Sequence, residues 1–149
     1  MTMTDAYPGL PDPRTRPEFY AGVPFKRGLA WFADAILIGL LTAVAVPFTA
    51  FTGLFFLPLL FLVIGFLYRW VTLAGGSATL GMRLMSIELR DRYGERFDSG
   101  HAFLHTVGYT VSVTVFPLQL ISIALMLISE RGQGLTDHIL GTAAIHRAV

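Results

Sequence analysis

The chain has 149 residues, of which 54% are hydrophobic and 14% are charged, and its formal net charge is +1. A soluble domain carries roughly 25% charged residues, so this composition indicates an integral membrane protein that contacts the lipid bilayer. So small a net charge excludes a general electrostatic attraction to nucleic acid. The absence of cysteine excludes disulfides, thiolate metal sites and a cysteine nucleophile.

Residues 1–24 are rich in proline and contain few large apolar side chains. A segment of this composition cannot bury enough apolar surface to offset the entropy that it loses on ordering. We therefore expect a disordered Pro-rich cytoplasmic tail over residues 1–24, followed by a membrane domain over residues 25–149.

A long apolar stretch follows the tail, and Asp34 is its only charged residue between positions 28 and 68. A membrane span needs about 20 apolar residues, so the stretch is long enough for two spans. The helix is weakened near Gly53. The sequence thus predicts a transmembrane helical hairpin with spans at about 28–50 and 54–74.

Basic residues flank this hairpin, whereas the turn between its two spans has no charge. The basic residues include Arg14, Arg16, Lys26, Arg27, Arg83, Arg90, Arg92 and Arg96. Because cytoplasmic loops of membrane proteins carry an excess of Lys and Arg, the N-terminus and residues 83–98 are expected in the cytoplasm, with the turn on the opposite side.

Residues 85–97 predict a small cytoplasmic β-hairpin. Apolar and polar residues alternate from Met85 to Arg90, and Gly94 suits a turn that needs a positive φ. An irregular polar loop is the alternative for this segment.

A third apolar stretch, at about 103–129, has Pro117 and Gln119 near its middle. It forms either a third span or two half-length helices in a re-entrant pair, with both ends on the cytoplasmic side. We favour the re-entrant form, which would let a strand at 142–146 pair with residues 85–89. The expected fold is an all-α membrane protein: a helical hairpin, a third transmembrane or re-entrant helical segment, and the small β-hairpin.

Asp34 lies roughly 10 Å along the first span. An ionised carboxylate at a helix centre costs about 2.5–3.5 kcal/mol on insertion scales, so it needs a cation or a proton. If the hairpin turns at residues 51–52, Asp34 and Arg69 lie at the same depth, which predicts a contact between them with Arg27 as a second donor. A coupling carboxylate for transport, a structural ion pair and an interface with a partner protein are the three readings of Asp34.

Small residues recur every four positions on the first span, at Ala35, Gly39 and Ala43. Such a ladder permits close approach of two helices. Packing against the second span is the preferred interpretation, and a dimer face is the alternative.

His101 and His105 are spaced to share one face of a helix, but no further ligand cluster is fixed near them. We therefore expect no metal site and no cofactor. An enzyme is not expected either, since no catalytic triad order, phosphate-binding loop or paired-carboxylate spacing is present.

Three blocks follow one another in the chain: Phe25–Asp34, Thr79–Gly94 and Leu135–Thr142. In order and spacing they resemble the RDD family of bacterial membrane proteins, and the resemblance covers about residues 25–146. The family is named for one arginine and two aspartates, which correspond here to Arg27, Asp34 and Asp137.

The resemblance implies a multi-pass protein of the bacterial inner (plasma) membrane, for which cation/proton exchange has been proposed. It also implies that Arg27, Asp34 and Asp137 act together on one side of the membrane, which requires a re-entrant third segment or an oligomer. The usual arginine at the start of the third apolar stretch is replaced here by His105. From the sequence alone, Asp137 is also a candidate first-turn acid of a short helix.

Two functions follow as hypotheses. The first is a small homo-oligomeric cation/proton exchanger or transporter, with Asp34 as the coupling carboxylate and Arg27 or Arg69 as its switchable partner. The second is an accessory or assembly subunit of a larger membrane protein complex, with no transport activity of its own and with Asp34 in a structural pair.

Overall fold

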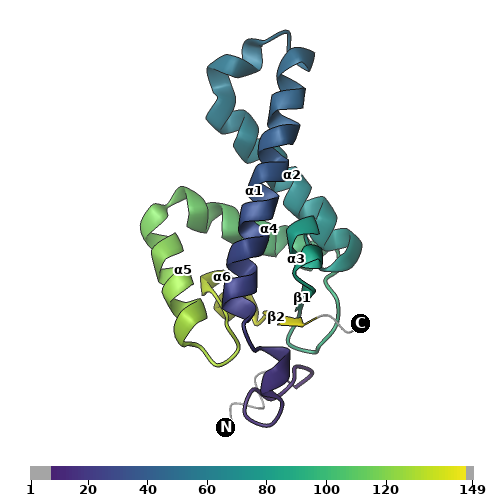
Figure 1. Cartoon of the computed structure of the whole chain (residues 1–149), viewed down its shortest axis with the longest axis vertical. Coiled ribbons are helices and arrows are strands. Elements are labelled where there is room, and N and C mark those ends of the chain that lie inside the picture. Colours follow the sequence, from purple (N-terminus) through teal and green to yellow (C-terminus); the bar gives the residue numbers. More distant parts are fainter. Residues whose placement is uncertain (1–7, 147–149) are drawn as a thin grey trace.

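A computed structural model of the chain describes residues 8–146. A long hairpin of α1 and α2 projects from a cluster of shorter elements that surrounds its lower half (Figure 1). In chain order the elements are η1 (Pro17–Phe19), α1 (Val23–Phe48), η2 (Thr52–Phe56), α2 (Leu57–Gly76), α3 (Leu80–Leu84), β1 (Ile87–Arg90), α4 (Ser99–Thr114), α5 (Phe116–Ile128), α6 (Leu135–Leu140) and β2 (Ala143–His146).

The hairpin of α1 and α2 agrees with the sequence-based prediction. The chain turns after Phe48, where Ala50 and Phe51 adopt positive φ values of 53° and 64°. The hydroxyl of Thr49 closes the turn by accepting a hydrogen bond of 3.0 Å from the Gly53 amide. Within residues 8–146, α1 and α2 are each long and apolar enough to cross a membrane.

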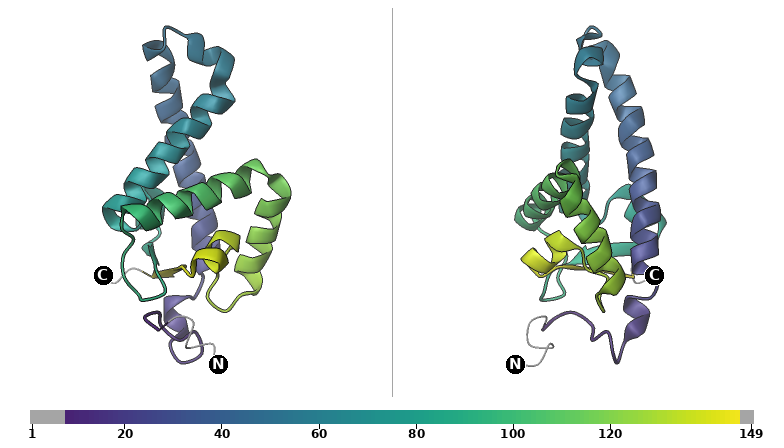
Figure 2. Two further views of the ribbon diagram at one scale, coloured as in Figure 1. Left: turned by 180° about the vertical axis from the view of Figure 1, so that it is seen from behind. Right: turned by 90° about the vertical axis from the view of Figure 1, so that its left-hand side faces the viewer.

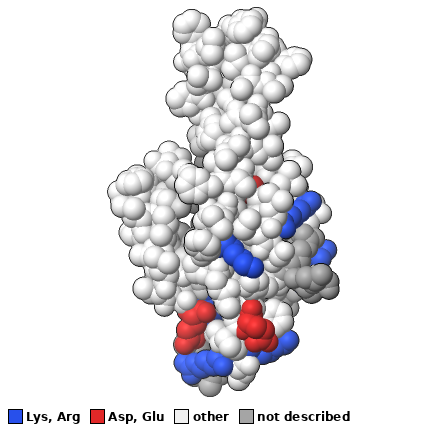
Figure 3. Space-filling model, in the orientation of Figure 1, with Lys and Arg blue, Asp and Glu red and all other residues white. Residues whose placement is uncertain are grey.

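The outer surface of this hairpin is apolar. Phe48 and Phe55, near its tip, are 87% and 84% exposed. On the face shown in Figure 3, charged side chains lie in the lower part of the molecule up to about its middle, and the upper part of the hairpin has none. An apolar surface of this extent is unfavourable in water, so it suits contact with lipid hydrocarbon.

The third apolar stretch is bent rather than straight. Its helices α4 and α5 meet at Val115 with an angle of 115° between them, and Pro117 lies in the first turn of α5. Figure 2 shows that the bend lies well below the tip of the α1–α2 hairpin and that α5 returns toward the sheet. This shape matches the re-entrant form in geometry.

The small sheet joins distant parts of the chain. β1 and β2 are antiparallel, with Ile87 opposite His146 and Arg90 opposite Ala143. This pairing is the one expected for the re-entrant form, in which a strand at 142–146 lies beside residues 85–89. Of the alternative β-hairpin predicted over residues 85–97, only an isolated bridge between Arg90 and Arg96 is formed.

The N-terminal segment differs from the expected disordered tail over the part that the structure describes, residues 8–24. Leu10 and Tyr20 are buried in a cluster with Ala143 and Ile145 of β2. The Tyr20 hydroxyl also donates a hydrogen bond of 2.7 Å to the carbonyl of Pro11. The apolar side chains on β2 supply a surface that the local composition of the tail could not reveal. Residues 1–7 of the expected tail lie outside the described residues.

Candidate functional site

Asp34 joins α1 to the end of α2 and to α3. It is 5% exposed. Its Oδ1 accepts hydrogen bonds from the Tyr68 hydroxyl at 2.6 Å and from the Gly81 amide at 2.9 Å, and its Oδ2 accepts one from the Thr79 hydroxyl at 2.6 Å. Buried carboxylates are stabilised by such donors, so this cluster holds Asp34 without a direct ion pair.

Two of the three hydrogen-bond donors to Asp34 lie at the start of the short helix α3: its N-cap Thr79 and Gly81. Thr79 caps the helix by accepting a hydrogen bond of 3.2 Å from the Met82 amide. A Cβ at position 81 would lie 2.2 Å from the Ala30 carbonyl oxygen and 2.8 Å from Asp34 Oδ1. Glycine is therefore the residue that lets α3 approach α1 closely enough for its amide to reach the carboxylate.

The expected contact between Asp34 and Arg69 is not formed among the described residues. Tyr68, the preceding residue, takes that place. Positions 68 and 69 both lie near the predicted depth in the hairpin, but neighbouring side chains on a helix point about 100° apart. The side chain that reaches Asp34 is therefore that of Tyr68. Arg69 instead lies with its Cζ 3.9 Å from the centre of the Tyr109 ring of α4.

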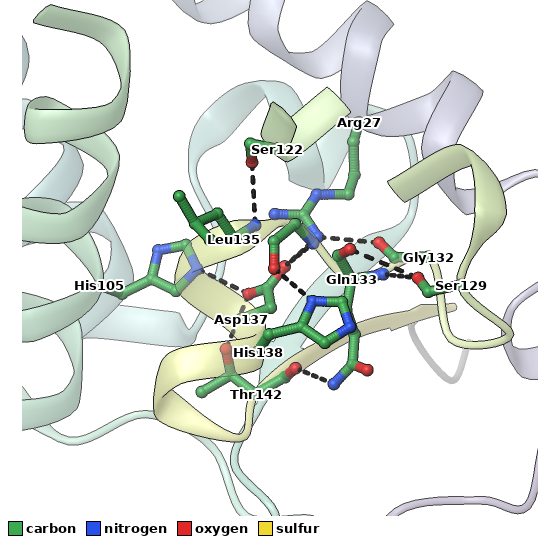
Figure 4. A network of polar contacts seen from close by, with 11 residues as sticks. Arg27, His105, Ser122, Ser129, Gly132, Gln133, Leu135, Asp137, His138 and Thr142 are labelled. Atoms are coloured by element: carbon green, nitrogen blue, oxygen red, sulfur yellow. Dashed lines mark hydrogen bonds and ion pairs between the residues drawn. The ribbon is translucent and has the colours of Figure 1, made fainter. Parts of the chain in front are cut away.

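Asp137 joins α1, α4, α6 and the start of β2 (Figure 4). Its Oδ2 accepts hydrogen bonds from Arg27 Nη1 at 2.6 Å and from the Gly134 amide at 3.0 Å. Its Oδ1 contacts His105 Nε2 at 2.9 Å and accepts a hydrogen bond of 2.7 Å from the Thr142 hydroxyl. Asp137 is thus both a capping acid of α6, through Gly134, and the partner of Arg27.

Burial by itself raises the pKa of Asp137, but the positive charge of Arg27 and the hydrogen bonds from His105 and Arg27 reverse this effect. The net result is a pKa well below the ordinary value for aspartate. Asp137 is therefore ionised throughout the physiological pH range and forms a buried ion pair with Arg27, whose side chain is 9% exposed.

His105 lies where the resemblance leads one to expect an arginine, and it faces the same carboxylate. Its Nδ1 is buried and has no hydrogen-bond partner among the described residues, which fits a neutral imidazole that donates from Nε2. His101 contacts Asp98 instead, at 3.1 Å. Within residues 8–146 no group of three or more His, Cys, Asp or Glu could hold a metal ion.

The ladder of small residues on α1 divides between two environments. Ala35 is half-buried and lines a small cavity with Phe61 and Gly65 of α2. A Cβ added at Gly39 would meet nothing within 4 Å, and Ala43 is exposed. The close approach of α1 and α2 occurs instead where Ile38 lies 3.6 Å from a Cβ built at Gly65. Packing of the whole ladder against the second span therefore stays a prediction, and the part of this face with Gly39 and Ala43 is not covered by any other segment that the structure describes.

The three residues of the predicted motif divide between two clusters. Arg27 and Asp137 meet directly, whereas Asp34 has separate donors. The sequence reasoning missed Tyr68 and Thr79 as donors to Asp34. Thr79 stands in the second block of the family resemblance, which was the available signal, but nothing in its spacing linked it to Asp34.

A cavity of about 490 Å³ adjoins both clusters, between α1, α4, α5 and α6. Asp34, Arg69 and Asp137 all line it. A molecule bound in this cavity would lie beside both clusters.

A family model described as the RDD family matches residues 21–141, which include Arg27, Asp34 and Asp137. No curated protein and no solved structure matches the chain.

Proposed function

The chain belongs to the RDD family, and we propose that it is an accessory or assembly subunit of a larger protein complex in the bacterial inner membrane. The observation that carries the proposal is that both oxygens of Asp34 and both oxygens of Asp137 already accept hydrogen bonds within the chain. A coupling carboxylate must exchange its partners for a proton or a cation during each cycle, whereas these two hold the fold together.

The uncovered face of α1 supports a role in assembly. Small side chains allow a neighbouring membrane helix to approach closely, and none of the helices described between residues 8 and 146 covers the face with Gly39 and Ala43. A helix of a larger complex fits this face, and so does a second copy of the chain in a homo-oligomer.

The proposed topology places the N-terminus, the sheet and both ends of the α4–α5 pair in the cytoplasm. The pairing of β1 with β2 supports it, because two strands that share hydrogen bonds lie on the same side of a membrane. The basic residues before α1 and after α2 favour the cytoplasmic side for this end. The α4–α5 pair is then re-entrant.

Single cysteines test this topology, since the chain has none of its own. Tyr93→Cys and Glu130→Cys are expected to react with a membrane-impermeant maleimide only in inverted vesicles, and Thr52→Cys only in intact spheroplasts. The side chains of Tyr93 and Glu130 are exposed, as is Thr52 in the turn. Labelling of Glu130→Cys from the same side as Thr52→Cys would show that the α4–α5 pair spans the membrane.

Purification of the tagged protein from its own membranes in a mild detergent tests the accessory role. We expect a larger complex in stoichiometric amount, and substitution of Gly39 by Leu is expected to release the chain from it. Ala33→Leu, on α1 but off the ladder, is the matched control. Recovery as a lone homo-oligomer would contradict the proposal.

Cation/proton exchange is the second candidate, and the cavity beside Asp34 and Arg69 favours it. Liposomes that contain the purified protein decide between the two functions. The accessory role predicts no exchange above empty liposomes. Exchange that disappears in Asp34→Asn, while the variant remains folded, would establish transport.

A further inference from the structure

The cavity of about 490 Å³ is suited to a hydrocarbon chain. Much of its wall is apolar, with Phe116, Ile123, Met126 and Leu127 contributed by α5. Ligand sites of roughly 300–1,000 Å³ hold small organic molecules and usually combine an apolar wall with a few polar groups. The cavity has the volume and the lining of such a site.

Arg69 supplies a cationic group in its wall. The residue is 7% exposed, and its buried Nε has no hydrogen-bond acceptor. Its guanidinium stacks over Tyr109 but forms no hydrogen bond or ion pair with any residue between 8 and 146. A buried charge without an acceptor is costly, so an anion that reached Arg69 would be bound favourably.

The polar groups around the cavity do not meet this need. Asp34 lies close enough to influence Arg69 through its charge, but its oxygens accept hydrogen bonds from other donors. Asp137 is paired with Arg27. Within residues 8–146 the Arg69 guanidinium therefore has no acceptor, and it is available to a ligand that enters the cavity.

We propose that the cavity binds a single-chain amphipathic carboxylate, a fatty-acid-like anion, with its head on Arg69 and its chain along α5. The planar guanidinium fork matches a carboxylate in a bidentate pair. Arg69 lies about 10 Å along α2 from its end at Gly76. That depth, one cation and a cavity of this size suit one charge and one chain better than a phospholipid with two chains and an interfacial headgroup.

This ligand site does not depend on the accessory role. It is argued from the cavity and Arg69, whereas the accessory role is argued from the hydrogen bonds that Asp34 and Asp137 accept. The test uses the Trp70→Phe protein in phosphatidylcholine nanodiscs. Trp31, which lines the cavity, is then the only tryptophan in the chain. Palmitate brominated on its chain is added, and quenching of Trp31 fluorescence is measured.

We expect saturable quenching that unlabelled palmitate reverses. Arg69→Gln is expected to weaken binding at least ten-fold, whereas Arg83→Gln, which removes an exposed cation that does not line the cavity, leaves it unchanged. Ile123→Phe narrows the cavity without altering any charge and is also expected to weaken binding. It provides the comparison if Arg69→Gln does not fold.

Three competitors complete the test. Palmityl alcohol has the same chain without the charge, phosphatidylglycerol offers a phospholipid anion, and inorganic phosphate has no chain. Stronger competition by palmitate than by all three supports the proposal. Equal competition by palmityl alcohol, or quenching unchanged by Arg69→Gln and Ile123→Phe, would overturn it as simple partition into lipid. Stronger competition by phosphatidylglycerol or by phosphate would overturn it in favour of another anion.

Discussion

Asp137→Asn is expected to lower the free energy of unfolding by about 3–5 kcal/mol, because it leaves the Arg27 charge buried without its counter-ion. The residue links α1 to α4 and α6, so the loss affects contacts between elements that are distant in the sequence. Thermal unfolding of the purified protein in detergent, followed by tryptophan fluorescence, measures the change.

Asp98→Asn is the matched control. Asp98 caps α4 by accepting a hydrogen bond of 2.8 Å from the His101 amide, and its side chain is 74% exposed. Asparagine is about as good a cap as aspartate, so a change of only a few tenths of a kcal/mol is expected. An equal loss of stability in both variants would show that the buried ion pair has no special importance.

A double-mutant cycle with Arg27→Gln isolates the pair. The double variant should lose less stability than the sum of the two single variants, because it leaves no lone charge buried. The depressed pKa of Asp137 adds an independent signature. Its contribution to stability is present above about pH 4, the ordinary pKa of aspartate, and is lost progressively as the pH falls below that. This loss on the acid side should be absent from Asp137→Asn.

Gly81→Ala is expected to separate α3 from α1 at a cost of about 3 kcal/mol, the upper end of the usual range for overpacking. The new Cβ would lie 2.2 Å from the Ala30 carbonyl oxygen, and a backbone atom cannot rotate away as a side chain can. Displacement of α3 would also withdraw Thr79 and the position 81 amide from Asp34. The same unfolding measurement reports the effect.

Gly39→Ala serves as the control for this substitution. Position 39 is helical and open, with nothing within 4 Å of an added Cβ. Alanine is favoured over glycine inside a helix by about 1 kcal/mol, so this variant should be at least as stable as the original protein. Similar destabilisation by both substitutions would argue against the steric explanation for Gly81.

The residues of the family motif were identifiable before the structure, but their contacts were only partly predictable. The joint action expected of Arg27 and Asp137 corresponds to a contact of 2.6 Å. Asp34 was recognised as a buried acid that needs partners, yet its donors proved to be Tyr68, Thr79 and Gly81 rather than Arg69. A partner assigned by depth alone leaves open which side of the helix faces the acid.

The sequence by itself determined the helical hairpin, the position of its turn, the location of the charges and the strand at β1, because hydropathy, charge and alternation are local properties of the chain. The pairing of β1 with β2 was expected only in combination with a re-entrant third segment. Tertiary structure decided the contacts of α3 with α1 and of Arg69 with Tyr109. These outcomes depend on the rotation of helices and on packing between residues far apart in the chain. Neighbouring side chains on a helix point about 100° apart. Tyr68 and Arg69 therefore contact different partners, Asp34 and Tyr109, although the hydropathy pattern places them at nearly the same depth.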